Sequence, residues 1–350
     1  MGYFPILYTR PSPVEYENGK EDPQYKKDKR VWTPTEIIYQ YIESEIPVIL
    51  AFDNHVVIVV GHKIYDRTKD IKSRLEGAVD GMRREEAIIR KRQRDYRHPS
   101  VTSTSLLVDA FIIQDDQGGV YRLLPTDKDS FELLQTDYGD LLPIEKQDEH
   151  GERYRSYETI EKSVGGIIIP LPDKIYLLAE DVYGLTKKLF SSEAKNRSLI
   201  PRIIEQGASG NRYAKNLLAS LVVDREDPVV LRIYCTKSSD FKSRVNAITG
   251  IDSMVRQTYL DISMPRFIWV AEISTFSVYA EHHRIVGEIL FDSTANKFDI
   301  NGCVLSTHLP GFFSFREGGE PGVSIDTEEP YSIHIRKTSK EPNTILGGGR

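Results

Sequence analysis

Cysteine is scarce in this sequence, and long apolar runs are missing. Two cysteines, Cys235 and Cys303, occur among 350 residues, too few for a disulfide-stabilised scaffold or a cysteine-built zinc site. Apolar runs such as residues 56–60 have the length of a strand, far below the ~20 residues that a membrane helix needs. The first residues carry no basic stretch followed by an apolar one, so we expect no secretory signal. These absences predict a soluble, cytoplasmic protein without a membrane partner.

The charge balance excludes further classes of protein. The formal net charge is −6, which disfavours a protein that coats nucleic acid. Hydrophobic residues make up 39% and charged residues 28% of the chain. These values are typical of globular proteins and exclude wholesale disorder or a collagen-like fibre. At roughly 150 residues per domain, the length is that of two domains.

Shifts in composition along the chain predict its organisation. Residues 1–32 are polar and interrupted by prolines, so we expect an irregular lead-in. A first folded region is expected over residues 33–145, followed by a polar linker over 146–157. A mixed α/β domain of unknown role is expected over 158–325, and the Gly-rich end at 326–350 predicts a flexible tail.

The first folded region is predicted to combine one amphipathic helix with strands. Thr33, Pro34 and Glu36 form the pattern of a helix start, with Thr33 as the N-cap. Residues 64–100 carry a highly charged helical pattern, which we interpret as an insertion. Apolar, strand-like segments occupy residues 48–52, 56–60, 106–113 and 121–124.

The second region is predicted to mix helices and strands, so the whole chain falls in the α+β class. Helical patterns cover residues 176–190 and 209–222. Segments rich in Val, Ile and aromatic residues predict strands at 166–169, 229–235, 267–273 and 285–291.

His55 is the most informative residue because it opens the fully apolar segment 56–60. A rigid strand would hold its backbone while the imidazole lies at the strand's exposed end. The segment 106–113 leads to Asp115 and Asp116. If the two strands pair antiparallel, the start of one lies opposite the end of the other, and His55 comes beside Asp115. A carboxylate there would fix the imidazole tautomer and stabilise the imidazolium ion, as a general base requires.

This stretch resembles the second half of the papain-like cysteine peptidases, including the C39-type processing peptidases. Their pattern is a Pro-Val strand, a His followed by apolar residues and Gly-Tyr, and a later strand that ends in Asn or Asp near a Gly. The matching residues here are Pro47-Val48, His55 through Gly61 with His62 in place of the Tyr, and Asp115-Asp116-Gln117-Gly118. The resemblance covers residues 35–125, a quarter of the chain.

The resemblance implies a papain-like half-sheet in which His55 is the general base and Asp115 orients it, with Asp116 as the substitute candidate. It implies peptide hydrolysis or acyl transfer on a peptide or protein substrate, with no cofactor and no metal.

The nucleophile does not follow the family pattern. In that family the Cys lies on a helix before the His, after an oxyanion-hole Gln, yet no Cys precedes His55 in this sequence. Three explanations stay open. Either the Cys belongs to a missing N-terminal half or a partner chain, or the chain is a pseudopeptidase, or the likeness is a coincidence. We expect the polypeptide to be inactive alone.

A non-catalytic interaction or scaffold protein is the alternative function. Under it, His55 is a hydrogen-bonded histidine at a strand end, and Asp115 and Asp116 are turn formers before Gly118 and Gly119. The basic residues at 83–97 could also contact phosphate or an acidic partner, although a solvated, salt-bridged helix fits them better.

Acidic residues also stand among apolar ones in the second region. Glu272 follows a strand-like segment, and Glu288 and Asp292 are four residues apart, which would place both carboxylates on one face of a strand. They could form a metal or acid–base pair, or pair with Arg266 or Arg284 across a sheet. His282 and His283 are adjacent and would point to opposite faces, which makes a poor joint metal site.

Overall fold

The computed structural model divides into two compact units and confirms the α+β class. The described residues of the first unit lie within Met1–Tyr65 and Leu107–Asp173, and those of the second within Asp66–Leu106 and Lys174–Glu341. The structure describes residues 2–10, 33–53, 55–64, 101–116, 119–127, 130–132, 134, 144–147, 153–156, 158–190, 229–276, 278–279, 284–295, 300–316, 324–326 and 336–337.

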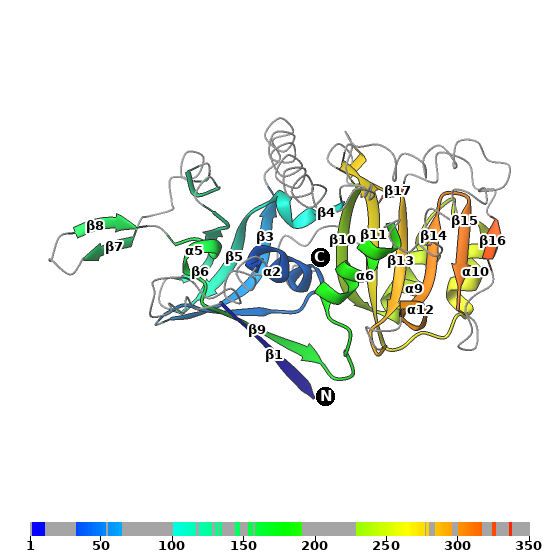
Figure 1. The fold of residues 1–350 in the computed structure, drawn as a ribbon, viewed down its shortest axis with the longest axis horizontal. Coiled ribbons are helices and arrows are strands. Elements are labelled where there is room, and N and C mark those ends of the chain that lie inside the picture. The colour runs from blue at the N-terminus through cyan, green and yellow to red at the C-terminus, as the bar shows by residue number, and fades with distance from the viewer. Residues whose placement is uncertain are drawn as a thin grey trace, which may run out of the picture. The chain divides into compact units, whose positions relative to one another are not determined.

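The first unit is built on a six-stranded antiparallel sheet with the order β1-β9-β2-β3-β5-β6 (Figure 1). The strands are β1 (Tyr3–Thr9), β2 (Val48–Ala51), β3 (Val56–Ile64), β5 (Val108–Asp115), β6 (Gly119–Pro125) and β9 (Gly166–Pro172). Alternate residues of β3 are buried and exposed: Val57 and Val59 are buried, whereas Val56 and Ile58 are exposed. One face of the sheet is therefore covered and the other open.

Helix α2 (Pro34–Glu43) packs against β2, β3 and β9. Pro34 occupies the first turn, where its missing N–H needs no intrahelical partner. Thr33 contributes its carbonyl, which accepts from the Ile37 N–H at 3.1 Å, whereas its side chain makes no capping bond. The helix stops before Glu45, which adopts a left-handed backbone with φ 58°.

The short elements of the first unit are the hairpin β7 (Ile144–Gln147) and β8 (Arg153–Ser156) and the helix α5 (Ile160–Ser163). Thr159 caps α5, accepting a hydrogen bond from the Lys162 N–H at 3.2 Å.

The second unit is built on a seven-stranded sheet with the order β16-β15-β14-β13-β11-β10-β4, in which only the β10–β4 pair is parallel. Its strands are β4 (Val101–Ser103), β10 (Val229–Lys237), β11 (Phe267–Thr275), β13 (Gly287–Asp292), β14 (Val304–Leu309), β15 (Phe312–Phe315) and β16 (Ser324–Asp326). Smaller elements are the 3-10 turn η1 (Thr104–Leu107), the pair β12 (Arg284–Ile285) and β17 (Arg336–Lys337), and α12 (Ile300–Cys303).

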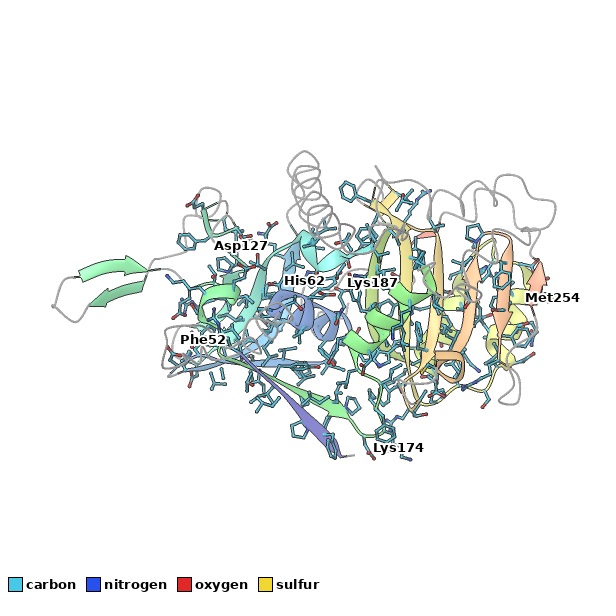
Figure 2. All side chains as sticks on the ribbon, viewed as in Figure 1. Phe52, His62, Asp127, Lys174, Lys187 and Met254 are labelled. Carbon is cyan, nitrogen blue, oxygen red and sulfur yellow. The ribbon has the colours of Figure 1, made fainter. Side chains whose placement is uncertain are left out.

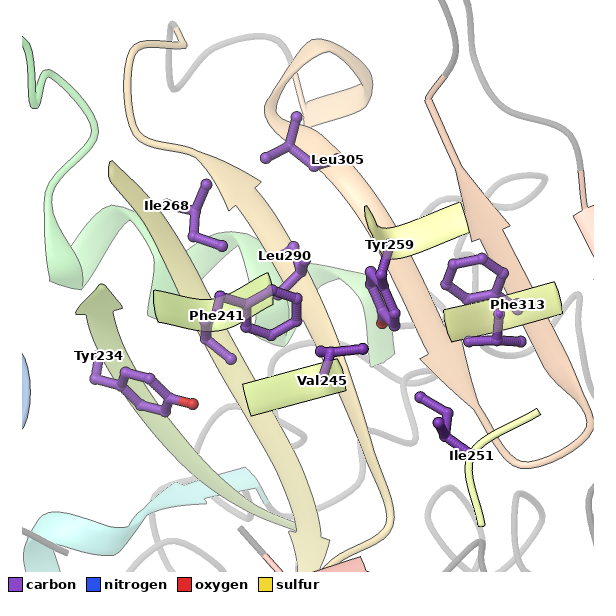
Figure 3. Close-up of a cluster of buried hydrophobic side chains, with 11 residues drawn as sticks. Tyr234, Phe241, Val245, Ile251, Tyr259, Ile268, Leu290, Leu305 and Phe313 are labelled. Atoms are coloured by element: carbon purple, nitrogen blue, oxygen red, sulfur yellow. The ribbon is translucent and has the colours of Figure 1, made fainter. Parts of the chain in front are cut away.

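Helices cover both faces of this sheet. On one face, α9 (Ser238–Ala247) and α10 (Ser253–Asp261) place Phe241 and Tyr259 in a buried cluster with Ile268 and Val270 of β11 (Figure 3). Trp269 lies between these two in sequence and so points to the opposite face. There α6 (Ala179–Phe190) contacts β10 and β11, and the Trp269 indole donates to the Leu177 carbonyl at 2.8 Å.

The structure differs from the predicted organisation at the start and in the middle of the chain. Tyr3–Thr9, predicted as part of an irregular lead-in, forms the edge strand β1. Pro5 was one of the prolines on which the predicted irregular lead-in was based. An edge strand tolerates proline because one side of its backbone needs no hydrogen-bond partner. The predicted linker 146–157 instead contains most of the β7–β8 hairpin.

The boundary between the units also lies later than predicted. Strand β9, assigned from the sequence to a domain starting at residue 158, pairs with β1 and β2 in the first sheet. Sequence order alone suggested that β9 belonged with the elements after it, whereas its antiparallel partners come from the first fifty-one residues. The predicted helical insertion at 64–100, apart from Ile64 at the end of β3, and the predicted helix at 209–222 lie outside the described residues. So does most of the predicted tail 326–350, although β17 within it pairs with β12.

Gly287 is expected to be irreplaceable at the start of β13. A Cβ there would lie 2.7 Å from the backbone oxygen of His308 and 2.7 Å from Leu309 Cδ2. We expect Gly287→Ala to lower the free energy of unfolding by about 1–3 kcal/mol through overpacking. Urea unfolding measures the change, with Gly184→Ala in α6 as the matched control.

The control should change stability in the opposite direction. A Cβ on Gly184 would meet nothing within 4 Å, and alanine in a helix interior is favoured over glycine by roughly 0.5–1 kcal/mol. If the two substitutions shift the unfolding midpoint equally, the close approach at Gly287 does not control the stability of the sheet.

Candidate functional site

Antiparallel pairing of β3 with β5 places His55 beside Asp115. Ile58 lies opposite Gln114 in this pair, so the start of β3 faces the end of β5. His55 Nε2 and Asp115 Oδ1 are 2.8 Å apart, within hydrogen-bond distance. The adjacency predicted from the sequence is confirmed, because two rigid strands running in opposite directions bring these ends together.

Arg122 of β6 completes a chain of three side chains. Its Nη1 donates to Asp115 Oδ2 at 2.8 Å, so both carboxylate oxygens of Asp115 have a partner. The exposed fractions of the side chains are 7% for Asp115, 23% for His55 and 48% for Arg122. The carboxylate is therefore buried between a partly exposed imidazole and a half-exposed guanidinium.

The two imidazole nitrogens of His55 have different surroundings. Nε2 faces the carboxylate, so in the neutral ring it carries the proton and donates to Asp115. Nδ1 then holds the lone pair, and it makes no hydrogen bond to any residue that the structure describes. This is the arrangement of a general base, in which one nitrogen is oriented by a carboxylate and the other can take a proton.

Asp116 occupies the exposed turn after β5 and makes no hydrogen bond or ion pair within the described part of the chain. Single ligand atoms of His55, Asp115 and Asp116 all lie within 4.8 Å of one another, a spacing that a metal ion could bridge. However, Arg122 already supplies a positive charge to Asp115, and His55 Nε2 faces its other oxygen. The donor set therefore fits an oriented base better than a cation site.

Both cysteines lie in the second unit and are buried. Cys235 belongs to β10 and is 2% exposed, and Cys303 ends α12 and is 0% exposed. Neither forms a disulfide. A buried cysteine in a packed core acts as a small apolar side chain, so neither is presented as a nucleophile.

His62, further along β3, belongs to a separate buried pair. The position of His62 is labelled in Figure 2. Its Nε2 lies 2.5 Å from Glu43 Oε1 of α2, and both side chains are fully buried. The ring also lies 5.2 Å from that of Tyr39, measured between centroids. This pair ties the helix to the sheet and, being closed to solvent, has no access to a substrate.

The acidic residues singled out in the second region bind separate partners. Glu272 pairs with Arg232 of the neighbouring strand at 3.0 Å, and Glu288 accepts from the Tyr259 hydroxyl at 2.9 Å. Asp292 forms an ion pair with Arg316 at 2.9 Å. The ion pair of Glu272 is with Arg232, where the sequence had suggested Arg266 or Arg284.

Sequence reasoning missed Arg122 and Arg232. Arg122 stands among apolar residues of β6, and the signal that could have found it is that β6 follows β5 closely in the sequence and pairs with it. Arg232 lies in a strand whose neighbouring residues are mostly apolar, so the sequence predicted the strand but not the charged pair within it. The basic residues at 83–97 and the pair His282-His283 lie outside the described residues.

Comparisons with known proteins assign no family to this chain. None of the described helices is both long and apolar enough to cross a membrane. No protein-family model matches the chain, and no curated protein or solved structure shows significant similarity to it.

Proposed function

We propose that this chain supplies the general-base half of a papain-like cysteine-peptidase site, acting on a peptide or protein substrate. The observation that carries the proposal is the bond from His55 Nε2 to Asp115 Oδ1 at 2.8 Å, which leaves Nδ1 as the nitrogen that can accept a proton. The antiparallel sheet and the preceding helix α2 are consistent with the same family pattern.

In the proposed reaction, His55 Nδ1 removes the proton of a thiol and forms a thiolate–imidazolium pair. The thiolate attacks the carbonyl carbon of the peptide bond, and the imidazolium returns its proton to the leaving amine as the carbon–nitrogen bond breaks. Water, deprotonated by the same nitrogen, then hydrolyses the thioester; a second nucleophile in its place gives acyl transfer. Asp115 stays ionised and holds the ring throughout.

The thiol is proposed to lie outside these 350 residues, on a partner chain or on a segment N-terminal to them. The burial of Cys235 and Cys303 supports this, because neither thiol can reach a substrate while the second unit is folded. Two cysteines that form no disulfide also fit the reducing cytoplasm, where we propose the protein works.

The purified chain alone is expected to be inactive towards peptides. A fluorogenic peptide library, assayed with and without a thiol-blocking reagent, measures this directly. The same chain should gain thiol-sensitive cleavage when it is isolated with its native partners, and mass spectrometry after labelling with an electrophilic peptide identifies the modified cysteine. Cleavage by the isolated chain that Cys235→Ala abolishes would contradict the proposal.

A non-catalytic interaction protein is the second candidate, and the open face of the first sheet favours it. Leu7, Ile168, Ile49 and Ile58 lie directly opposite one another in a row across β1, β9, β2 and β3. Leu7 is 63% and Ile58 41% exposed. A contiguous apolar row of this kind is typical of a surface that binds another protein.

A further inference from the structure

The carboxylate of Asp115 is held from both sides of its own strand. Strand β5 lies between β3 and β6 in the sheet. From the β3 side His55 contacts Oδ1, and from the β6 side Arg122 contacts Oδ2, each at 2.8 Å. With a single partner a carboxylate can turn about its Cβ–Cγ bond. Two partners on opposite oxygens fix its plane.

The burial of Asp115 distinguishes its ion pair with Arg122 from an ordinary surface pair. Pairs of exposed charges contribute little, because water screens them and both side chains stay mobile. Here the carboxylate of Asp115 is only 7% exposed, so its oxygens depend on protein donors for the hydrogen bonds that water would otherwise supply. The guanidinium of Arg122 is one of those donors.

The backbone of β6 is shaped so that Arg122 reaches Asp115. The β5–β6 pairing shifts register between Ile113 and Asp115, and Arg122 lies opposite Ile113, on the face that Asp115 shares. The preceding residue, Tyr121, has φ 60°. A bulky residue rarely adopts this left-handed conformation, and such strain of about 1–3 kcal/mol persists where the surrounding structure imposes it.

We propose that Arg122 is a positioning residue for the candidate base, and that the left-handed backbone at Tyr121 aims it. This inference rests on the proposed function. Arg122 holds Asp115 ionised and in one plane, Asp115 in turn fixes the Nε2–H tautomer of His55, and Nδ1 is kept ready for the thiol proton. Arg122 acts through Asp115 and does not itself contact the reacting atoms.

The test follows the His55 Nε2–H proton by NMR in protein labelled with 15N-histidine. Its resonance, identified by its loss in His55→Gln, is expected to be shifted downfield and protected from exchange with water. In Arg122→Gln we expect exchange about tenfold faster, as for the loss of a hydrogen bond to a charged group. Arg122→Lys should restore part of the protection, because it returns the charge without the planar fork.

Arg10→Gln is the matched control. Arg10 lies in the same unit, but it bonds the carbonyls of Lys162 and Glu161, so its loss should leave the His55 signal unchanged. Tyr121→Gly supplies an independent variant in case Arg122→Gln does not fold. Glycine accepts the left-handed backbone but also frees it, so exchange should again accelerate.

Unchanged protection in Arg122→Gln, or in Tyr121→Gly where Arg122→Gln does not fold, would overturn the inference and reduce Arg122 to a surface ion pair. The measurement needs neither a thiol nor a substrate. A chain that shows the predicted signals but never gains peptidase activity therefore refutes the proposed function alone.

Discussion

Replacing His55 by alanine is expected to lower kcat/KM for peptide cleavage about 10²–10⁴-fold in the assembly that we propose carries the thiol, the range that a general base contributes. His55 is the residue whose Nδ1 would take the thiol proton, and its other nitrogen is committed to Asp115. Its partial exposure, 23% of the side chain, predicts that alanine there leaves the fold intact. Kinetics of the native assembly and circular dichroism of the variant measure the two effects.

Neighbouring carboxylates provide the control for this result. Asp115→Ala should also lower kcat/KM, because His55 Nε2 then loses the side-chain oxygen that orients the imidazole. Asp116→Asn should leave kcat/KM unchanged, since Asp116 lies exposed in the turn and makes no hydrogen bond or ion pair with any residue that the structure describes. Full activity in His55→Ala would instead support the interaction protein, and loss of activity in Asp116→Asn alone would reassign the orienting residue.

Glu272→Ala is expected to lower the free energy of unfolding by about 3–5 kcal/mol, a large part of the stability of an ordinary domain. Glu272 pairs with Arg232 at 3.0 Å, and the exposed fractions of the two side chains are 0% and 1%. Its second oxygen accepts from the Tyr234 hydroxyl at 3.2 Å. Alanine removes both contacts and leaves a guanidinium buried without its counter-charge.

Tryptophan fluorescence can measure this loss of stability specifically in the second unit. The sequence has two tryptophans, and Trp269 lies fully buried in β11, the strand that carries Glu272. In a Trp32→Phe background, urea unfolding followed at Trp269 therefore measures the stability of the second unit.

A double replacement separates pairing from packing. Arg232→Met combined with Glu272→Leu removes both charges together and should recover most of the stability, because neither member of the pair is left buried without its counter-charge. The double-mutant cycle isolates the coupling between the two side chains. A loss below about 1 kcal/mol in Glu272→Ala would mean that Arg232 finds another partner or water, in the range of a surface pair.

The buried pair belongs to a longer row of titratable side chains across the second sheet. Arg232, Glu272, Glu288 and His308 lie directly opposite one another on β10, β11, β13 and β14. All four are almost completely buried. The sequence shows each of them only as a polar residue among apolar ones, because the pairing that joins them spans 76 positions, from 232 to 308.

Patterns within a few residues were sufficient to locate several core strands of both units, although β14 and β15 were not predicted. The apolar segments at 48–52, 56–60 and 229–235 became β2, β3 and β10, because burial on a sheet selects Val, Ile and aromatic side chains. Helices α9 and α10 were not predicted. Each has few buried apolar residues, such as Phe241 and Val245 in α9, which is too weak a periodic signal to recognise.

The sequence by itself determined the α+β class, the helix start at Pro34 and the adjacency of His55 and Asp115. These follow from local patterns and from the rule that antiparallel strands bring opposite ends together. Only the tertiary structure decided that β1 and β9 complete the first sheet, that Arg122 holds the second oxygen of Asp115, and that Arg232 neutralises Glu272. Each of these depends on strand order and register, which are set by packing between segments distant in the chain. Patterns among residues adjacent in the sequence therefore do not reveal them.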